Sequence, residues 1–161
     1  MSKTGIFAHF GSKEELQIAT VNRAKEVFLE LVVKPALVEQ RGLRRLKVML
    51  ASWLGYVERS VFRGGCFFAA ASLEFDSRPG RVRDEVVALT HAWIDALQKE
   101  VARAKAQREI ARDTGSAQLA FELHAFVQEA NWAYKLFGDQ AAFSRARKAI
   151  ANRIGQASRE L

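Results

Sequence analysis

The stretch LRRLKVMLASWLGYVERSV, residues 43–61, carries the clearest structural period in the chain. Its apolar residues recur at steps of three and four, which is the spacing of one face of an α-helix. The glycine pair Gly64-Gly65 follows it and suits the end of a helix. The stretch therefore predicts a long amphipathic helix whose inner face holds Leu43, Leu46, Leu50, Trp53, Leu54, Val57 and Val61.

The helical period continues upstream of this stretch. Ser12, with Glu15 three residues later, forms a capping-box pattern, in which each side chain accepts a hydrogen bond from the backbone N–H of the other residue. A helix is therefore expected from Ser12. We expect it to end at Pro35, because a proline disfavours helical backbone in the residue before it.

Downstream, the run CFFAAA at residues 66–71 is apolar on all sides and predicts a short buried helix, followed by a turn at residues 76–80. Another apolar stripe runs from Val82 to Val101 and should end in a connector near residues 113–115. Two last helices, at 119–137 and 143–161, are separated by Gly138 and should form an antiparallel pair. Convincing alternating strands are absent, so an all-α fold is expected.

Composition and charge narrow the class of protein. A chain of 161 residues with 49% hydrophobic and 27% charged residues is typical of one globular domain. Its longest uncharged runs have ten residues, which is too few to span a bilayer, so no membrane partner is expected. Its start lacks a secretory signal, so a cytoplasmic location is expected. The excess of 25 basic over 18 acidic residues weakly favours a nucleic-acid partner.

Residues 2–16, SKTGIFAHFGSKEEL, resemble the recognition helix and the following helix start of tetracycline-repressor-like (TetR family) transcriptional regulators. The resemblance implies a short helix that enters the DNA major groove, where small side chains allow close approach to base edges. Phe7 stands where the family often has a tyrosine that bonds a phosphate. The DNA-contacting residues expected on this basis are Ser2, Lys3, Thr4, Gly5, Phe7, Ala8, His9 and Lys13.

The resemblance also implies a division of the chain. The family carries about forty residues ahead of this motif, including the first two helices of the helix-turn-helix. Residues 1–15 are therefore expected to be a remnant of the helix-turn-helix domain, and residues 16–161 a helical ligand-binding and dimerisation domain. Operator DNA should bind only when the missing helices are present, so the sequence is interpreted as a fragment of the full regulator.

Family members bind a small-molecule inducer inside the helical body and pair through their last two helices. The expected pocket residues are aromatic or polar, and each taken alone is also compatible with plain core: Trp53, Tyr56, Phe67, Phe68, Trp93, His124 and Trp132, with His91 and Asn131 as further polar groups. The expected homodimer interface consists of Phe126, Ala130, Phe137, Phe143, Ala146, Ile150 and Ile154.

Chemistry-bearing patterns other than this motif are weak. The three histidines lack metal-binding spacing, and neither a phosphate-binding loop nor a nucleophile elbow occurs, so no metal, cofactor or enzymatic activity is expected. The lone thiol of Cys66 lies in an apolar run, which favours burial and inertness over redox sensing. The basic run at residues 103–112 is interpreted as a solvated face.

The sequence thus predicts a DNA-binding transcriptional regulator, a repressor, in which ligand binding and DNA binding weaken each other. The alternative is a helical small-molecule-binding or assembly protein that never contacts DNA.

Overall fold

The computed structural model describes residues 10–159, which are helical and contain no strand, as the sequence predicts. The chain begins with α2 (Lys13–Phe28), which passes into the π-helical turn η1 (Leu29–Val33) and the short α3 (Lys34–Leu37). Ser12 caps α2, because its Oγ accepts from the backbone N–H of Glu15 at 3.1 Å. The second half of the predicted capping box is wrong, since the carboxylate of Glu15 accepts instead from Arg81.

The prediction that the first helix ends at Pro35 is also wrong. The backbone of Lys34 stays helical, with φ −56° and ψ −42°, and its N–H bonds to the carbonyl of Leu29, five residues back. A proline ring normally clashes with the carbonyl four residues before it. The wider π turn rearranges the carbonyls in front of Pro35, and the helix continues to Leu37.

The next helix, α4 (Leu43–Glu58), begins at two carboxylates that come from later in the chain. Gly42 N–H donates to Glu100 at 2.8 Å and Leu43 N–H donates to Glu109 at 2.9 Å. Negative charge at this end of a helix is favoured by the helix dipole. The helix ends at Glu58, before the predicted Val61, because Ser60 has a positive φ of 50°.

The apolar run at 66–71 opens α5 (Phe67–Phe75) and leads through the predicted turn into α6 (Arg81–Ala106). The expectation that the run is buried throughout is only partly right. Cys66 and Ala71 are buried, whereas Phe67 and Phe68 are half-buried and Ala70 is exposed. This follows from the position of α5, which packs against α6 and leaves its other side uncovered.

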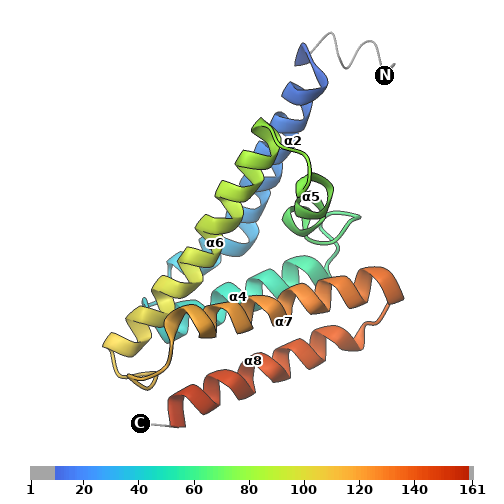
Figure 1. The fold of residues 1–161 in the computed structure, drawn as a ribbon. Helices are drawn as coiled ribbons and strands as arrows, with labels where there is room; N and C mark the ends of the chain where they lie inside the picture. Colours follow the sequence, from blue (N-terminus) through green and yellow to red (C-terminus); the bar gives the residue numbers. More distant parts are fainter. Residues whose placement is uncertain (1–9, 160–161) are drawn as a thin grey trace.

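The last two helices, α7 (Ser116–Phe137) and α8 (Ala141–Arg159), form the predicted antiparallel pair (Figure 1). Gly138 ends α7 in the left-handed region, with φ 70°, which glycine adopts without steric cost. Only a short loop then joins it to α8.

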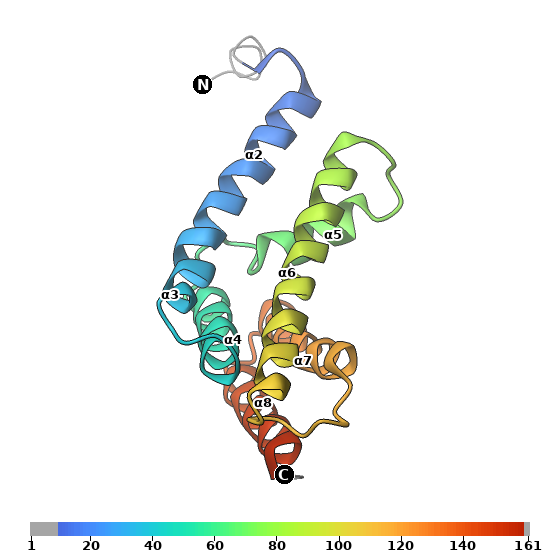
Figure 2. The ribbon, with the colours of Figure 1, turned by 90° about the vertical axis from the view of Figure 1, so that its left-hand side faces the viewer.

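The helices form two groups at an angle to each other. Helices α2 and α6 lie side by side along the length of the molecule, and α4, α7 and α8 lie across their lower end (Figures 1 and 2). The main core lies where the two groups meet, and its fully buried side chains include Leu46, Trp53, Leu97, Leu123, Val127 and Phe143. A smaller buried cluster of Val21, Ala71, Val82 and Val86 joins α2, α5 and α6.

Candidate ligand pocket and interaction surfaces

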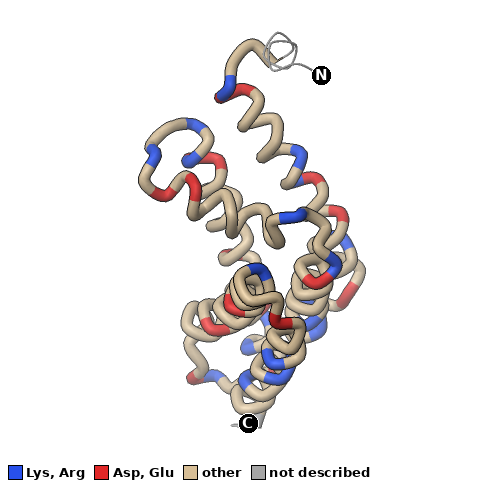
Figure 3. Tube along the Cα trace, turned by 90° about the vertical axis from the view of Figure 1, so that its right-hand side faces the viewer, with Lys and Arg blue, Asp and Glu red and all other residues tan. Residues whose placement is uncertain are grey.

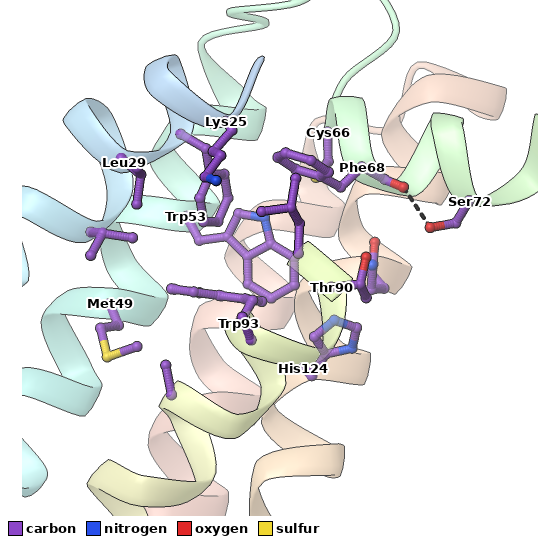
Figure 4. A pocket seen from close by; sticks show the side chains of 16 residues that line it. Lys25, Leu29, Met49, Trp53, Cys66, Phe68, Ser72, Thr90, Trp93 and His124 are labelled. Carbon is purple, nitrogen blue, oxygen red and sulfur yellow. Dashed lines mark hydrogen bonds between the residues drawn. The ribbon is translucent and has the colours of Figure 1, made fainter. Parts of the chain in front are cut away.

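A cavity of about 370 Å³ lies within the helical body. Side chains from α2, η1, α4, α5, α6 and α7 form its wall, together with Cys66 (Figure 4). The cavity therefore lies where the long α2–α6 pair meets the crossing helices. Movement of any of these helices would change its shape.

Aromatic rings form the apolar wall of the cavity. Trp93 contacts both Phe28 and Trp53 edge-on, with ring centroids 5.0 Å and 5.5 Å apart, and Phe28 meets Phe68 at 5.8 Å. Edge-on pairs of this kind are a favourable arrangement of aromatic rings. The rings come from α2, α4, α5 and α6, so that they hold four helices around one apolar space.

A few polar groups interrupt this wall. Thr90 Oγ1 and Trp93 Nε1 are buried and have no hydrogen-bond partner among the described residues. His124 lies beside Trp53, with ring centroids 5.0 Å apart, and burial lowers the pKa of its imidazole below the ordinary value. Burial therefore favours the neutral form of the His124 imidazole.

Four of the seven predicted pocket residues line the cavity: Trp53, Phe68, Trp93 and His124. The other three lie elsewhere. Tyr56 is buried behind Phe28, at 5.6 Å between ring centroids, and burial raises the pKa of its hydroxyl. Phe67 packs against the smaller cluster, and Trp132 is 48% exposed on the outer face of α7.

The two further polar candidates do not face the cavity either. Asn131 is buried, and its Oδ1 accepts from the backbone N–H of Cys66 at 2.9 Å, so that it ties the start of α5 to α7. His91 is exposed on α6. Cys66 itself is buried, and desolvation raises the pKa of its thiol, which agrees with an inert side chain.

Sequence reasoning missed several residues of the cavity wall, notably Phe28, Met49 and Thr90. Phe28 and Met49 lie among other apolar residues, where nothing distinguishes a cavity wall from a filled core. Thr90 did carry a signal, because it is a polar residue within the apolar stripe of α6, one turn after Val86.

Most predicted DNA-contacting residues, Ser2, Lys3, Thr4, Gly5, Phe7, Ala8 and His9, lie outside the described residues. Lys13 lies within them, exposed at the start of α2. Beside it, Arg81 at the start of α6 pairs with Glu15 at 2.5 Å and with Glu14 at 3.5 Å. The two helices that lead away from the cavity are thus joined at their amino-terminal ends.

The predicted dimer residues lie mostly inside the single chain. Ala130, Phe143, Ala146, Ile150 and Ile154 are buried, because they pack α7 and α8 into the main core. Phe137 is 67% exposed. Phe126, Ala130 and Ala146 also border a shallow groove between α7 and α8, whose other small residues are Ala133, Ala142 and Ala149.

A different set of apolar residues covers the outer face of α7. Phe121, Trp132 and Leu136 are all largely exposed, at 66%, 48% and 61%. They are eleven and four positions apart, close to three turns and one turn of helix, so they share one face. Trp132 and Leu136 are adjacent on this face, and adjoining exposed apolar side chains mark interaction sites more often than solitary ones do.

Charged residues of both signs are interspersed along much of the described chain (Figure 3). In the basic run, Arg103, Arg108 and Arg112 are exposed, as expected for a solvated face, whereas Lys105 is half-buried and its Nζ donates to the carbonyl of Thr114 at 2.5 Å. Residues 10–159 contain no group of His, Cys, Asp and Glu placed to hold a metal ion. Within the same range, no helix combines the length and apolar character needed to cross a bilayer.

The chain matches the model of a known protein family. The family model described as the tetracyclin repressor-like C-terminal domain matches residues 42–150. The matched range starts at the residue that caps α4 and extends into α8, so it contains α4, α5, α6 and α7 entire. No curated protein matches the chain.

Proposed function

The chain belongs to the tetracycline repressor-like family, and from this premise we propose that it is a homodimeric transcriptional regulator, a repressor, whose helical body binds a small molecule. The proposed regulator has no enzymatic activity. Binding of the small molecule in the cavity weakens binding of operator DNA, and DNA weakens binding of the small molecule by the same factor.

One observation carries this proposal: α2 connects the cavity to the segment that resembles a DNA-reading helix. Phe28 and Lys25, at the end of α2, contribute to the cavity wall. At its other end, α2 follows directly on residues 2–12. A ligand that displaces Phe28 would therefore move the helix that directly follows, in sequence, the segment that resembles a DNA-reading helix.

Ion pairs at the start of α2 join this helix to α6, which also contributes to the cavity wall. Arg81 links Glu14 and Glu15 to the start of α6, and α6 supplies Thr90 and Trp93 to the cavity. Both helices of the long pair thus run from the cavity to the same end of the molecule. Exposed ion pairs are weak, so this connection can change partners at little cost.

The outer face of α7 supports the homodimer. Phe121, Trp132 and Leu136 are apolar side chains with no partner helix in the described chain. In the proposed dimer, α7 and α8 of one subunit pack against α7 and α8 of the other, and the small residues of the groove between them allow close approach.

The test uses the gene product extended upstream to include the two helices that family members carry before the DNA-reading helix. Fluorescence anisotropy would measure its binding to a labelled DNA fragment from ahead of its own gene. We expect specific binding that a small-molecule extract of the source cells reverses. A well-folded, extended dimer that binds this and other promoter fragments no better than unrelated DNA would favour the alternative, a helical binding protein without DNA activity.

A further inference from the structure

Resting on the proposed ligand-binding function, we propose that the cavity takes a ring-containing apolar carboxylate, with its carboxylate held by Thr90, His124 and Gln128. The rings of such a molecule would lie among the aromatic side chains. Three observations carry the proposal: the shape of the apolar wall, the unused polar groups at one side of it, and the charge of the lining residues.

The apolar wall suits a flat ring. Phe28, Trp53 and Trp93 approach one another edge-on, and aliphatic residues such as Leu29 and Met49 complete the same side of the cavity. Aromatic faces and edges bind other rings through offset or perpendicular contacts. An apolar ring system gains the free energy of leaving water there without needing any hydrogen bond.

Three polar lining residues lie at another side of the cavity, whereas the buried indole N–H groups of Trp53 and Trp93 belong to its aromatic wall. Thr90 and His124 lie together away from Leu29 and Met49 (Figure 4). Gln128 follows His124 by one turn on the same face of α7. Thr90 Oγ1 is buried without a partner, and neither His124 nor Gln128 hydrogen-bonds another described residue.

Buried polar groups usually find a partner within the protein, so the buried, unpartnered Thr90 Oγ1 at the cavity points to a ligand, and His124 and Gln128 are half-buried neighbours with free hydrogen-bonding capacity. A hydroxyl, an imidazole and a carboxamide can each donate a hydrogen bond. Together they can supply three donors to the two oxygens of one carboxylate. Such hydrogen bonds offset part of the cost of taking a carboxylate out of water.

The charges of the lining residues favour an acid over a base. Among the described residues, the titratable groups that line the cavity are Lys25 on α2, Cys66 ahead of α5 and His124 on α7. Within the same part of the chain, α4 and α6 contribute none, and no aspartate or glutamate lines the cavity. An organic cation would therefore be buried without an opposite charge, which is costly. A carboxylate beside His124 would have a partner, because the imidazole can take up one proton from solvent and become its counter-ion.

The test compares three probes with one ring system: 2-naphthylacetate, its primary amide, and 2-(2-naphthyl)ethylammonium. Isothermal titration calorimetry on the 161-residue chain would measure their affinities. We expect the acid to bind at least about tenfold more tightly than the amide, which is the effect of about 1.4 kcal/mol, and the ammonium to show no binding at millimolar concentration. Affinity for the acid should rise between pH 8 and pH 6, and affinity for the amide should stay constant.

Two variants locate the carboxylate. His124→Gln keeps a hydrogen-bonding side chain but cannot become charged, so it should lower affinity for the acid to that for the amide and abolish the pH dependence. His91→Gln, on the exposed side of α6, should change neither. Circular dichroism would confirm that both variants are folded.

Several results would overturn the proposal. These are an amide or ammonium that binds as tightly as the acid, a failure of all three probes to bind, or acid affinity that survives His124→Gln but is lost in Lys25→Met. DNA plays no part in this test, so such a result removes the acid as the ligand class. The regulator proposal is judged separately by promoter binding.

Discussion

Two polar residues within apolar helix faces have different roles in this molecule. Asn131 on α7 has a structural role, because its Oδ1 accepts from the backbone N–H of Cys66 at the start of α5. The Oγ1 of Thr90 on α6 has no hydrogen-bond partner among the described residues and borders a cavity. The sequence pattern is similar in both cases, a polar residue among apolar ones. Only the position of a neighbouring helix decides whether the residue stabilises the fold or is available to a ligand.

His124 should make stability depend on pH. Burial lowers its pKa in the folded state below the ordinary 6.5. The unfolded chain therefore binds this proton more readily, and the free energy of unfolding should fall as the pH drops through 6.5 toward the folded-state pKa. Urea unfolding between pH 7.5 and 5.5 would measure the decline. His124→Gln should flatten it and His91→Gln should not; an equal slope in both variants would contradict the assignment.

Gly65 is a residue where a side chain cannot be tolerated. Its φ is +79°, and a Cβ atom there would meet the side chains of Asn131 and Lys135. Gly65→Ala should lower the free energy of unfolding by about 1–3 kcal/mol, through backbone strain and damage to the Asn131 hydrogen bond. Gly64→Ala is the matched control, because its Cβ would make only an ordinary contact. Chemical denaturation of both variants tests this, and equal stability would contradict it.

At the level of elements, local signals predicted the helices well and their interruptions poorly. The apolar stripes of α4, α6 and α7 and the ends at Ser12 and Gly138 follow from short-range rules. The predicted helix end at Pro35 is wrong because a π turn allows the helix to continue past the proline. That turn is held by the packing of η1 against α4, which no local pattern reveals.

The start of α4 depends on residues far away in sequence. Glu100 is 6% exposed; it accepts from Gly42 N–H and pairs with Arg41 Nε at 3.2 Å. Glu100→Gln should therefore lower the free energy of unfolding by about 1–3 kcal/mol, because a buried charged acceptor is lost. Asp95→Asn, exposed on the same helix, should change it by less than about 0.5 kcal/mol. Thermal and urea unfolding would compare the two variants. An equal change in the free energy of unfolding would show that the Glu100 carboxylate at the start of α4 contributes nothing to stability.

At the level of the whole molecule, about half of the residues that the sequence predicted for the pocket line the cavity. Trp53, Phe68, Trp93 and His124 were predicted and do line the cavity, whereas Tyr56, Phe67 and Trp132 do not. An aromatic residue in a helical stripe has the same pattern in a filled core, a cavity wall or an exposed face. The angle between the α2–α6 pair and the crossing helices separates these cases, and that angle is a property of the assembled chain.

The outer face of α7 predicts the oligomeric state. We expect a dimer at micromolar concentration in sedimentation velocity, and Leu136→Glu should convert it to monomer, because a charge would be buried in the proposed interface. Leu73→Glu is the matched control, since Leu73 is similarly exposed on α5. A monomeric parent chain, or dissociation by both substitutions alike, would contradict an interface on α7.

In the proposed regulator, the state of the cavity controls DNA binding through α2 and α6. Ala96→Trp tests this most directly, because Ala96 lines the cavity and a large side chain there stands in for a ligand. Ala102→Trp, on the exposed side of the same helix, is its control. In the upstream-extended regulator, Ala96→Trp should weaken promoter binding at least about tenfold, while Ala102→Trp leaves it unchanged. A folded Ala96→Trp dimer that binds the promoter as tightly as the parent would contradict the claim.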